Sequence, residues 1–523
     1  MLKKIPHTYV IVFSLVVIAA IATWFVPGGV YEASDIEGGM PVFKHVDNQP
    51  QTWQVFGALF KGFERQAGII VFILMIGGAF WIINDSKAID VGIKSFLKFT
   101  NRLDKYRFIR WIGSGNLVIV LIMLMFSVFG AVFGMSEETI AFIIILVPLA
   151  VSMGYDSLTG VGMVFVASGL GFAGAVLNPF TIGIAQGIAG LPLFSGIEFR
   201  MFSWLLINIV GISFVLWHAR RVKRNPAKSP VYNVDDYWRK FLHGKEGGEE
   251  AITYKASWIS YFVLLLTLAV FSFSYPETTL DVGGRSITWW FIPAISAAFA
   301  ISGYLSLRNS SSVFVLNILG YTILFLIVGV MGYQWYIMEI AALFFAMGIL
   351  AGAAMGKSPD TITKLFLEGA VDIMSAALVV GLAGGIIIIL EDGQIIHTIL
   401  HSMAGGMNNL GQIATVELMY LIQTAINIVI PSGSAKAALT MPIMAPFSDL
   451  VGLSRQATVM AYQFGDGFTN LITPTSGVLI GVLGVAKIPY ATWAKWITPL
   501  ILMLMVLGAL LLIPTVTMDL NGF

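Results

Sequence analysis

The strongest constraint on the fold is a pair of interruptions inside the apolar stretch of residues 427–480. The first is the polar turn Pro431–Lys436 (PSGSAK), and the second is Asp466–Asn470 (DGFTN) followed by Thr473–Ser476 (TPTS). Lipid offers no hydrogen-bond partner, so backbone that leaves a helix at membrane depth must be covered by protein or line a wet cavity. Two such breaks in one stretch therefore predict a binding site within a bundle of membrane helices.

Composition sets the class of protein. Of the 523 residues, 57% are hydrophobic and 11% are charged, whereas a soluble domain carries about a quarter charged residues. We therefore expect an all-α polytopic membrane protein in a lipid bilayer. The chain has no cysteine, which excludes disulfides, thiolate metal sites and cysteine nucleophiles. Its net charge of +1 gives no reason to expect a nucleic acid partner, and no motif predicts a cofactor or a metal.

Hydropathy predicts about eleven crossings, with some apolar segments too short or too interrupted to cross. The segments are 8–26, 67–84, 111–133, 140–155, 158–190, 201–217, 257–275, 287–306, 313–332, 334–354, 371–391, 412–430, 437–451, 457–487 and 494–513. Lys3 and Lys4 precede the first one, which places the N-terminus in the cytoplasm. Two basic clusters, at 85–111 and 218–255, are expected on the same side.

The second half of the chain repeats the first. Gly62 corresponds to Gly369, Ser136–Thr139 to Pro431–Ser434, and Asn178–Thr181 to Thr473–Ser476. Three spans separate the halves, and an odd number of crossings turns the second half upside down. Inverted repeats with broken helices in matching positions are typical of secondary transporters, whose site lies where the breaks converge.

This repeat predicts the domain organisation. The first repeat, 1–217, contains scaffold helices, an arm, a re-entrant hairpin at 111–155 and a broken helix at 158–190. A cytoplasmic loop (218–256) and linking scaffold helices (257–333) follow. The second repeat, 334–523, contains an arm, a hairpin at 412–451 and a broken helix at 457–487. The alternative for the first repeat is that all four segments between the basic clusters cross, but the polar tip Gly134–Thr139 (GMSEET) favours a hairpin.

Four charged side chains fall at membrane depth: Glu137, Glu138, Lys436 and Asp466. Left unpaired in lipid they would together cost on the order of 10 kcal/mol. They must therefore be paired, solvated in a cavity or in contact with a ligand. A fixed ion pair of Lys436 with Asp466 or with one of the glutamates is the structural alternative to a functional role.

The candidate substrate-binding residues come from the hairpin tips and the broken-helix loops. A tip with free N–H groups and serines suits a carboxylate, and a glutamate opposite it suits an ammonium or guanidinium. The serines can instead cap a helix, and the neutral oxygens can merely satisfy the interrupted backbone. The substrate-binding candidates are Glu137, Glu138, Thr139, Asn178, Thr181, Ser432, Gly433, Ser434, Lys436, Asn470, Thr473, Thr475 and Ser476. The ion-coupling candidates are Asp466, Asn178 and Asn470.

Two weaker signals are interpreted as structural. Ser168–Gly174 matches a dinucleotide-binding glycine pattern, but it lies in an apolar span with no preceding strand, so it indicates close helix packing. His397 and His401 share a helix face without a third ligand, which favours an arm surface over a metal site.

Long motifs at the two breaks resemble a known family. The runs Pro431–Pro446, Gln463–Asn470 and Pro474–Gly477, with Ile5–Val10 and Gly134–Thr139, are similar to the YfcC-like branch of the C4-dicarboxylate anaerobic carrier family, in the ion transporter superfamily. The resemblance implies an elevator-type carrier, a homodimer, in the inner (plasma) membrane of a bacterium. It also implies small carboxylates or amino acids as substrates, antiport of basic amino acids in some members, and a coupling cation, H+ or Na+.

These observations predict a secondary active transporter of a small carboxylate-bearing metabolite. The glutamate pair opposite a serine-rich tip favours an amino acid, a basic one, moved by exchange or ion coupling. Lys436 between two helix starts favours the alternative, a C4-dicarboxylate or another short organic acid. A channel is a more distant alternative. An enzyme is not expected, because the spans lack a His-Glu-x-x-His motif, cysteine and a Ser/His constellation.

Overall fold

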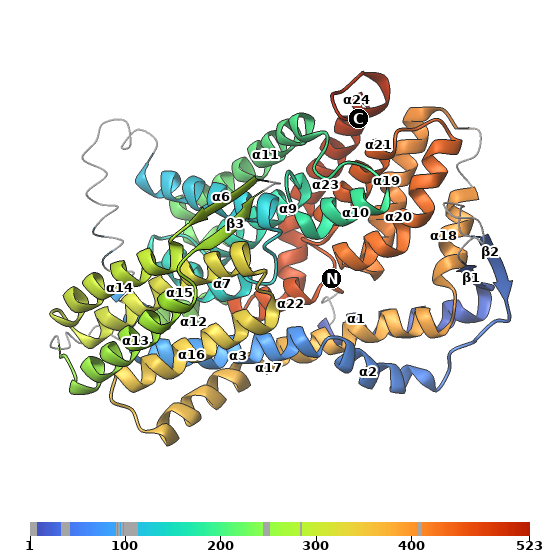
Figure 1. Cartoon of the computed structure of the whole chain (residues 1–523). Coiled ribbons are helices and arrows are strands. Elements are labelled where there is room, and N and C mark those ends of the chain that lie inside the picture. The colour runs from blue at the N-terminus through green and yellow to red at the C-terminus, as the bar shows by residue number, and fades with distance from the viewer. Residues whose placement is uncertain are drawn as a thin grey trace.

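The computed structural model describes residues 8–32, 42–89, 91, 92, 95, 98, 113–243, 252–282, 285–405 and 410–523. This part of the chain is mostly helical, with two small antiparallel sheets of two strands each. Its helices form two groups that pack side by side (Figure 1). Most of the first predicted arm, 86–110, lies outside the described residues.

The first group, called here the frame helices, is built around the long helix α17, which packs along α2, α3 and α1. α3 also packs on α16, and α13 to α16 pack on one another. The frame helices are α1 (Thr8–Phe25), α2 (Gln54–Arg65), α3 (Ala67–Asp85), α13 (Lys255–Ser274), α14 (Phe291–Leu307), α15 (Ser311–Tyr333), α16 (Ile337–Ala354) and α17 (Pro359–Asp392).

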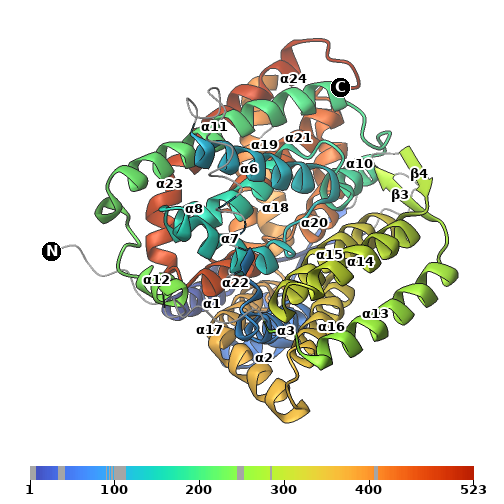
Figure 2. The ribbon, with the colours of Figure 1, turned by 90° about the vertical axis from the view of Figure 1, so that its left-hand side faces the viewer.

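The second group, called here the site helices, contains both predicted hairpins and both predicted broken helices (Figure 2). It comprises α6 (Ser114–Phe133), α7 (Thr139–Ser152), α8 (Ser157–Val161), α9 (Ala167–Gly174), α10 (Ile184–Ile188), α11 (Ile197–Arg224), α19 (Gln412–Val429), α20 (Gly433–Leu450), α21 (Arg455–Thr469), α22 (Gly477–Ala486) and α23 (Tyr490–Leu512). π-helical turns at Gly162–Val166 and Pro179–Gly183 belong to the same group.

The chain leaves helical geometry inside each predicted broken helix. α9 ends at Gly174, Ala175 takes a left-handed φ of +37°, and helical geometry resumes at Pro179. α21 ends at Thr469 and α22 begins at Gly477. Within the predicted hairpins, residues 134–138 join α6 to α7 and residues 430–432 join α19 to α20. A proline ends or redirects a helix because it lacks an N–H and restricts the residue before it.

By length and composition, nine helices of the described ranges can span a membrane, or ten if both parts of α17 count as one span. The sequence predicted about eleven crossings. α14 falls short at 17 residues, because residues 287–289 of the predicted span 287–306 belong to a strand instead. Helix α2 was not predicted, because its polar and charged residues lower its mean hydropathy.

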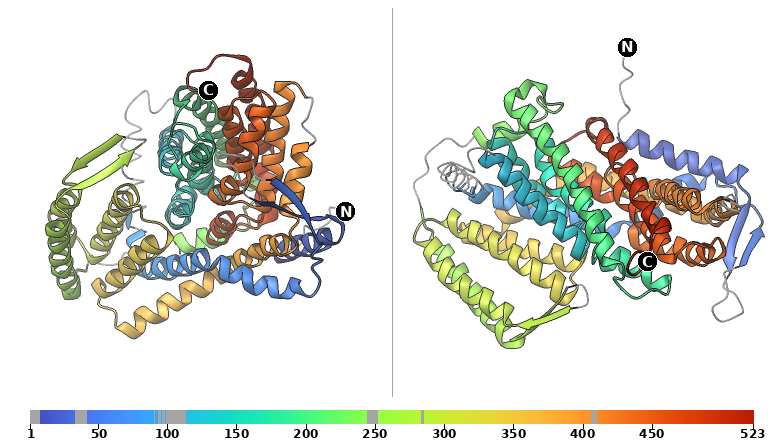
Figure 3. Two further views of the ribbon diagram at one scale, coloured as in Figure 1. Left: turned by 45° about the vertical axis from the view of Figure 1, so that its right-hand side comes forward. Right: turned by 90° about the horizontal axis from the view of Figure 1, so that it is seen from above.

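The two sheets were also not predicted. β1 (Gly28–Glu32) pairs antiparallel with β2 (Val42–Val46), in register Gly28 to Val46, and β3 (Thr278–Val282) pairs with β4 (Arg285–Trp289), in register Thr278 to Trp289. β1 contacts helix α18 (Ile396–Gly405), where the Tyr31 N–H donates to His397 Nδ1 at 2.9 Å. Figure 3 shows both sheets at the edge of the molecule. The two histidines of α18 therefore anchor a strand.

The basic segment after α11 folds back onto the helices. It contains a 3-10 turn (Pro226–Lys228) and the short helix α12 (Asp236–His243), and the chain closes with α24 (Pro514–Thr517). Trp238 of α12 donates to the Ala486 carbonyl at the end of α22, at 3.0 Å. The next residue, Lys487, forms an ion pair with Asp372 of α17 at 2.7 Å. The ion pair links the end of α22 to the frame helices.

Glycines allow α17 to lie directly against α2 and α3. A Cβ atom at Gly62 would lie 2.4 Å from the Gly385 nitrogen, and one at Gly369 would lie 2.4 Å from the Gly77 oxygen. In the predicted sequence repeat, Gly62 corresponds to Gly369 and Gly77 to Gly384, and a Cβ atom at Gly384 would lie 2.6 Å from the Gly62 oxygen. Gly62 therefore packs on Gly384, and Gly369 packs on Gly77.

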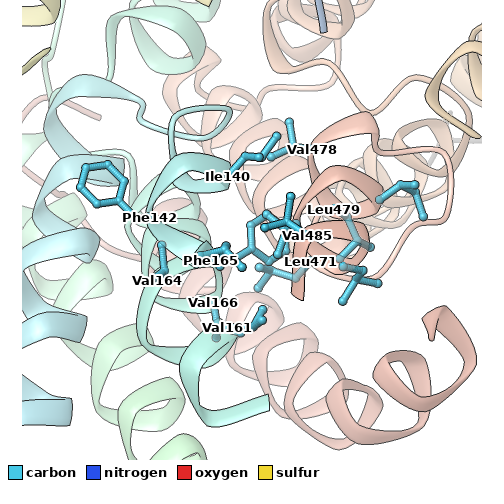
Figure 4. Packing of buried hydrophobic residues seen from close by; sticks show 14 of the residues in the cluster. Ile140, Phe142, Val161, Val164, Phe165, Val166, Leu471, Val478, Leu479 and Val485 are labelled. Carbon is cyan, nitrogen blue, oxygen red and sulfur yellow. The ribbon is translucent and has the colours of Figure 1, made fainter. Parts of the chain in front are cut away.

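The apolar core joins the two halves of the site helices. Figure 4 shows Ile140 of α7 and Phe165 of the π-helical turn facing Val478 and Leu479 of α22. All four are buried in one continuous hydrophobic cluster. Helix α22 is held closely between α7 and α3, since a Cβ atom at Gly481 would lie 2.9 Å from Ile140 Cδ1.

Candidate functional site

A cavity of about 310 Å³ lies where the two hairpin tips and the two helix breaks meet. Its polar lining comes from both halves of the chain. The lining residues are Arg65, Gln66, Ile69, Gly134, Ser136, Glu137, Phe165, Phe172, Phe180, Thr181, Tyr336, Ala383, Ile387, Ile430, Pro431, Ser432, Gly433, Ser434, Ala435, Asn470, Thr475, Ser476, Gly477 and Val478. A volume of this size suits a solute of amino acid dimensions.

The first tip presents one of its two glutamates to the cavity. Glu137 lines the cavity, and its Oε1 accepts a long hydrogen bond from the Tyr336 hydroxyl at 3.4 Å. Glu138 is buried and turns back to accept from the Ser136 N–H at 2.9 Å. One carboxylate is thus available to a solute, and its neighbour stabilises the turn that holds it.

The second tip presents hydroxyls and the start of a helix. Ser432 and Ser434 are exposed to the cavity, and Ser432 makes no side-chain capping bond although it stands at the N-cap position of α20. The first N–H groups of a helix have no intrahelical acceptor. The capping interpretation of Ser432 is therefore not supported, and its hydroxyl remains free to contact a solute.

The second tip packs closely against the first helix break. A Cβ atom at Gly433 would lie 2.7 Å from Thr181 Cγ2 and 3.2 Å from Asp466 Oδ2. The Gly433 carbonyl accepts from the Tyr462 hydroxyl at 2.5 Å. Only a residue without a side chain fits this position, so the site is assembled from both halves at van der Waals distance.

Beneath the second tip lies a buried ion pair. Lys436 Nζ is 3.0 Å from Asp466 Oδ1, and both side chains have no exposed surface. The ammonium also lies 3.5 Å from the Gln423 carbonyl and 4.9 Å from the centre of the Tyr462 ring. The fixed ion pair considered from the sequence is present, and neither partner lines the cavity.

Asn470 connects this ion pair to the cavity. It lines the cavity, and its Nδ2 donates to Asp466 Oδ2 at 3.2 Å, while its Oδ1 accepts from Asn427 Nδ2 at 2.9 Å. Beside it, the Thr475 hydroxyl donates to the Ile428 carbonyl at 2.6 Å. The same hydroxyl forms a hydrogen bond with the Thr473 hydroxyl at 2.8 Å. The broken backbone near Ile428 is therefore satisfied by side chains of the second break.

The first break leaves two buried polar atoms without a hydrogen-bond partner among the described residues, Thr181 Oγ1 and Asn178 Nδ2. Asn178 Oδ1 accepts from the Phe180 N–H at 2.9 Å, which stabilises the turn. Thr181 lines the cavity. An unsatisfied buried hydroxyl is costly, so a solute or water in the cavity is its natural partner.

The cavity thus contains part of the predicted set. The predicted residues that line it are Glu137, Thr181, Ser432, Gly433, Ser434, Asn470, Thr475 and Ser476. The predicted residues that do not line it are Glu138, Thr139, Asn178, Lys436, Asp466 and Thr473. Residues of the second set form contacts within the tips and breaks. The Thr139 hydroxyl, for example, donates to the Ser136 carbonyl of the first tip.

Most of the other lining residues are apolar and were not predicted, and the polar ones that were not predicted are Arg65, Gln66, Ser136 and Tyr336. Arg65 ends α2 and forms an ion pair with Glu391 of α17 at 2.5 Å. A basic residue directly before the apolar run of α3 was the one available signal in the sequence. Tyr336 lies between two spans, where nothing distinguishes it from an interfacial aromatic.

A Ser, His and Asp cluster does occur at the edge of the site helices. His218 Nε2 lies 2.9 Å from Asp156 Oδ2, and Ser229 donates to the same oxygen at 2.7 Å. The aspartate lies between the other two, so the histidine does not accept the serine proton, and this arrangement does not activate a nucleophile. In the described residues, no group of three or more metal-ligating side chains forms a metal site.

Comparison with known proteins gives consistent matches along the chain. The family model described as DcuC, C4-dicarboxylate anaerobic carrier, matches residues 5–517. The Escherichia coli K12 protein named "Putative basic amino acid antiporter YfcC" is 32% identical, over 97% of this chain and 96% of its own. An uncharacterised Haemophilus influenzae protein is 25% identical, over 98% and 97%.

Among solved structures, the YdaH transporter of Alcanivorax borkumensis is similar with a TM-score of 0.41 and 16% identity. The alignment covers 97% of this chain and 98% of that one. A likeness at this level is too low to transfer a residue role or a motion.

Proposed function

This chain belongs to the C4-dicarboxylate anaerobic carrier family, and from that premise we propose that it carries an amino acid, a basic one, by exchange or ion coupling. The protein is a multi-pass integral membrane protein of a transporter family, not an enzyme. The name of its Escherichia coli relative agrees with the proposed substrate class.

The observation that carries the proposal is the polarity of the cavity. Glu137 of the first tip offers a carboxylate to the cavity, and the exposed serines of the second tip, Ser432 and Ser434, line it at the start of α20. A carboxylate ligand suits a helix start with free N–H groups and hydroxyls, and a cationic group suits Glu137. An amino acid satisfies both ends at once.

We further propose an elevator mechanism built on an inverted repeat. The glycine contacts between α17 and the pair α2 and α3 support the two-fold relationship of the halves. The cavity supports a mobile site group, because frame residues (Arg65 and Ala383) line one wall and site residues line the other. The re-entrant character of both hairpins, a homodimer and a location in a bacterial inner membrane belong to the same proposal.

The alternative substrate class, a C4-dicarboxylate, is favoured by one specific observation. Arg65 lines the cavity and is a partner for a second carboxylate. However, it is already paired with Glu391, so a dicarboxylate must displace that bond. The amino acid requires no such exchange.

The coupling ion is proposed to act through Asp466 and the asparagines Asn470 and Asn178. Since Lys436 already neutralises Asp466, a proton or sodium ion reaches this carboxylate only when the ammonium withdraws or loses its proton. Uptake measured under an imposed pH gradient, and separately under a sodium gradient, distinguishes the two ions.

Transport in proteoliposomes tests the proposal. Purified protein should show saturable counterflow of labelled arginine or lysine, competed by the unlabelled amino acid. Counterflow of succinate without arginine counterflow would assign the dicarboxylate alternative, and non-saturable flux of either would indicate a channel. Thermal shifts with the same solutes measure binding independently of transport.

A further inference from the structure

Helix α11 carries an uncovered apolar stripe that ends in a basic groove. Met201, Phe202, Leu205, Ile209 and Trp217 are each about half exposed. Phe202, Leu205, Ile209 and Trp217 recur in steps of three, four and eight, so they share one face of the helix, and Met201 lies next to the first of them. The stripe runs along α11 to its C-terminal end, where the polarity of the same face changes.

At that end lies a cavity of about 580 Å³, called here the α11 groove. It is lined by Ser213, Leu216, Trp217, Arg220, Arg221, Arg224, Asn225 and Lys228. Four of the eight are basic and none is acidic. Lys228 comes from the 3-10 turn after the helix, so the groove is formed by two segments and is not only one side of a helix.

The arginines of the α11 groove are not neutralised within the described ranges. No ion pair joins Arg220, Arg221 or Arg224 to a described carboxylate. Arg221 lies over the Trp217 ring, 5.6 Å from its centre, which directs the guanidinium toward the end of the apolar stripe. Trp is the side chain most typical of the boundary between lipid tails and head groups.

We propose that the α11 groove binds the head group of an anionic phospholipid, whose acyl chains lie along the stripe. A phosphate matches the forked donors of arginine, and clusters of basic residues next to a membrane helix bind anionic lipids. A soluble phosphate would use the groove alone, whereas a lipid also covers the adjoining apolar stripe. The continuity of stripe and groove therefore selects the lipid. By the charge rule applied to the sequence, this lipid lies in the cytoplasmic leaflet.

The inference is independent of the proposed substrate, because the α11 groove shares no residue with the transport cavity. The proposal also predicts which lipid the α11 groove binds weakly. Phosphatidylcholine has the same chains and phosphate but carries a compensating cation, so it should bind much more weakly.

Native mass spectrometry of the full-length protein tests the proposal. Released from micelles containing equal amounts of phosphatidylglycerol and phosphatidylcholine, the protein should retain phosphatidylglycerol preferentially. The triple variant Arg220→Gln, Arg221→Gln, Arg224→Gln should lose that preference, with roughly fivefold weaker binding for each arginine removed. Arg308→Gln is the matched control, since Arg308 also lies over an aromatic ring, Tyr304, at 5.4 Å but outside any cluster.

Three results would overturn the proposal. They are equal retention of both lipids by the unaltered protein, equal loss of preference in Arg308→Gln, and saturation of the groove by inorganic phosphate or glycerol phosphate without any lipid. A melting curve for each variant shows whether it is folded. If the triple variant is not, Arg221→Gln alone should still lower phosphatidylglycerol binding about fivefold, and no change would equally reject the site.

Discussion

Lys436 Nζ lies 3.0 Å from Asp466 Oδ1, and both side chains are completely shielded from solvent. Removing one partner of such a pair leaves an uncompensated buried charge, which typically costs about 3–5 kcal/mol. We therefore expect Lys436→Met and Asp466→Asn each to lower the free energy of unfolding by about that amount. The double variant should recover most of the loss, because no charge remains.

Chemical or thermal unfolding in detergent micelles measures this pair. The decisive quantity is the coupling between the two substitutions rather than either loss alone. If the double variant is as unstable as the two single losses added together, the two side chains do not stabilise each other.

The two adjacent glutamates should behave differently. Glu137→Gln keeps an oxygen for the Tyr336 hydroxyl but removes the charge that faces the cavity. We expect arginine to bind about tenfold more weakly or worse, as for loss of a hydrogen bond to a charged group. Glu138→Gln retains an acceptor for the Ser136 N–H and should leave arginine binding within about twofold. Titrations followed by calorimetry compare the two, and the reverse order would assign the amine contact to Glu138.

The tight fit at the second tip makes Gly433 sensitive to one added carbon. In Gly433→Ala the new Cβ atom would meet Thr181 Cγ2 at 2.7 Å, so we expect a loss of about 1–3 kcal/mol from overpacking, together with loss of substrate binding. Gly320→Ala in α15 is the control, since no atom lies within 4 Å of its Cβ position. It should stabilise the helix by up to about 1 kcal/mol. Equal melting temperatures for the two variants would contradict the close contact.

Stability should depend on pH through Asp235, in the loop before α12. Desolvation by burial, with a smaller contribution from the charge of Asp156, raises the pKa of Asp235 from 3.8 to about 6. The folded protein therefore holds this proton more tightly than the unfolded chain. Its stabilising effect is complete below about pH 4 and is lost as the pH rises through 6.

Asp235→Asn should remove this pH dependence. At pH 7.5 the variant should be more stable than the unaltered protein, by an amount bounded by about 3 kcal/mol for a shift of this size. The difference should shrink on acidification to pH 5. Melting temperatures across that range check the prediction, and a constant difference at all pH values would show that Asp235 does not titrate there.

The sequence was most informative where backbone chemistry is local. Proline next to asparagine or threonine marks a point where a helix cannot continue, and both breaks, after Gly174 and after Thr469, fall where these residues predicted them. The buried pair Lys436 and Asp466 was also foreseen as one alternative, because two opposite charges in an apolar stretch have few other partners.

The sequence was least informative where contacts join distant segments. The bond from Tyr31 to His397 spans 366 residues, so the docking of the first sheet on α18 could not be anticipated from hydropathy. Glu137 and Glu138 are neighbours in a non-helical turn, where no periodicity tells which one faces inward. Arg65 reaches the cavity only because the packing of α2 on α17 brings it there.

The ion pair between Lys487 and Asp372 has a consequence for any cycle in which the site helices slide past the frame helices. Each partner is partly open to water, with 22% and 28% of its side chain exposed, so breaking the pair costs at most about 1 kcal/mol. The pair is therefore a weak contact between the two groups of helices, which stabilises the arrangement seen here and is readily broken by thermal motion. In the elevator cycle proposed above, a contact of this strength would hold one end state without blocking the departure from it.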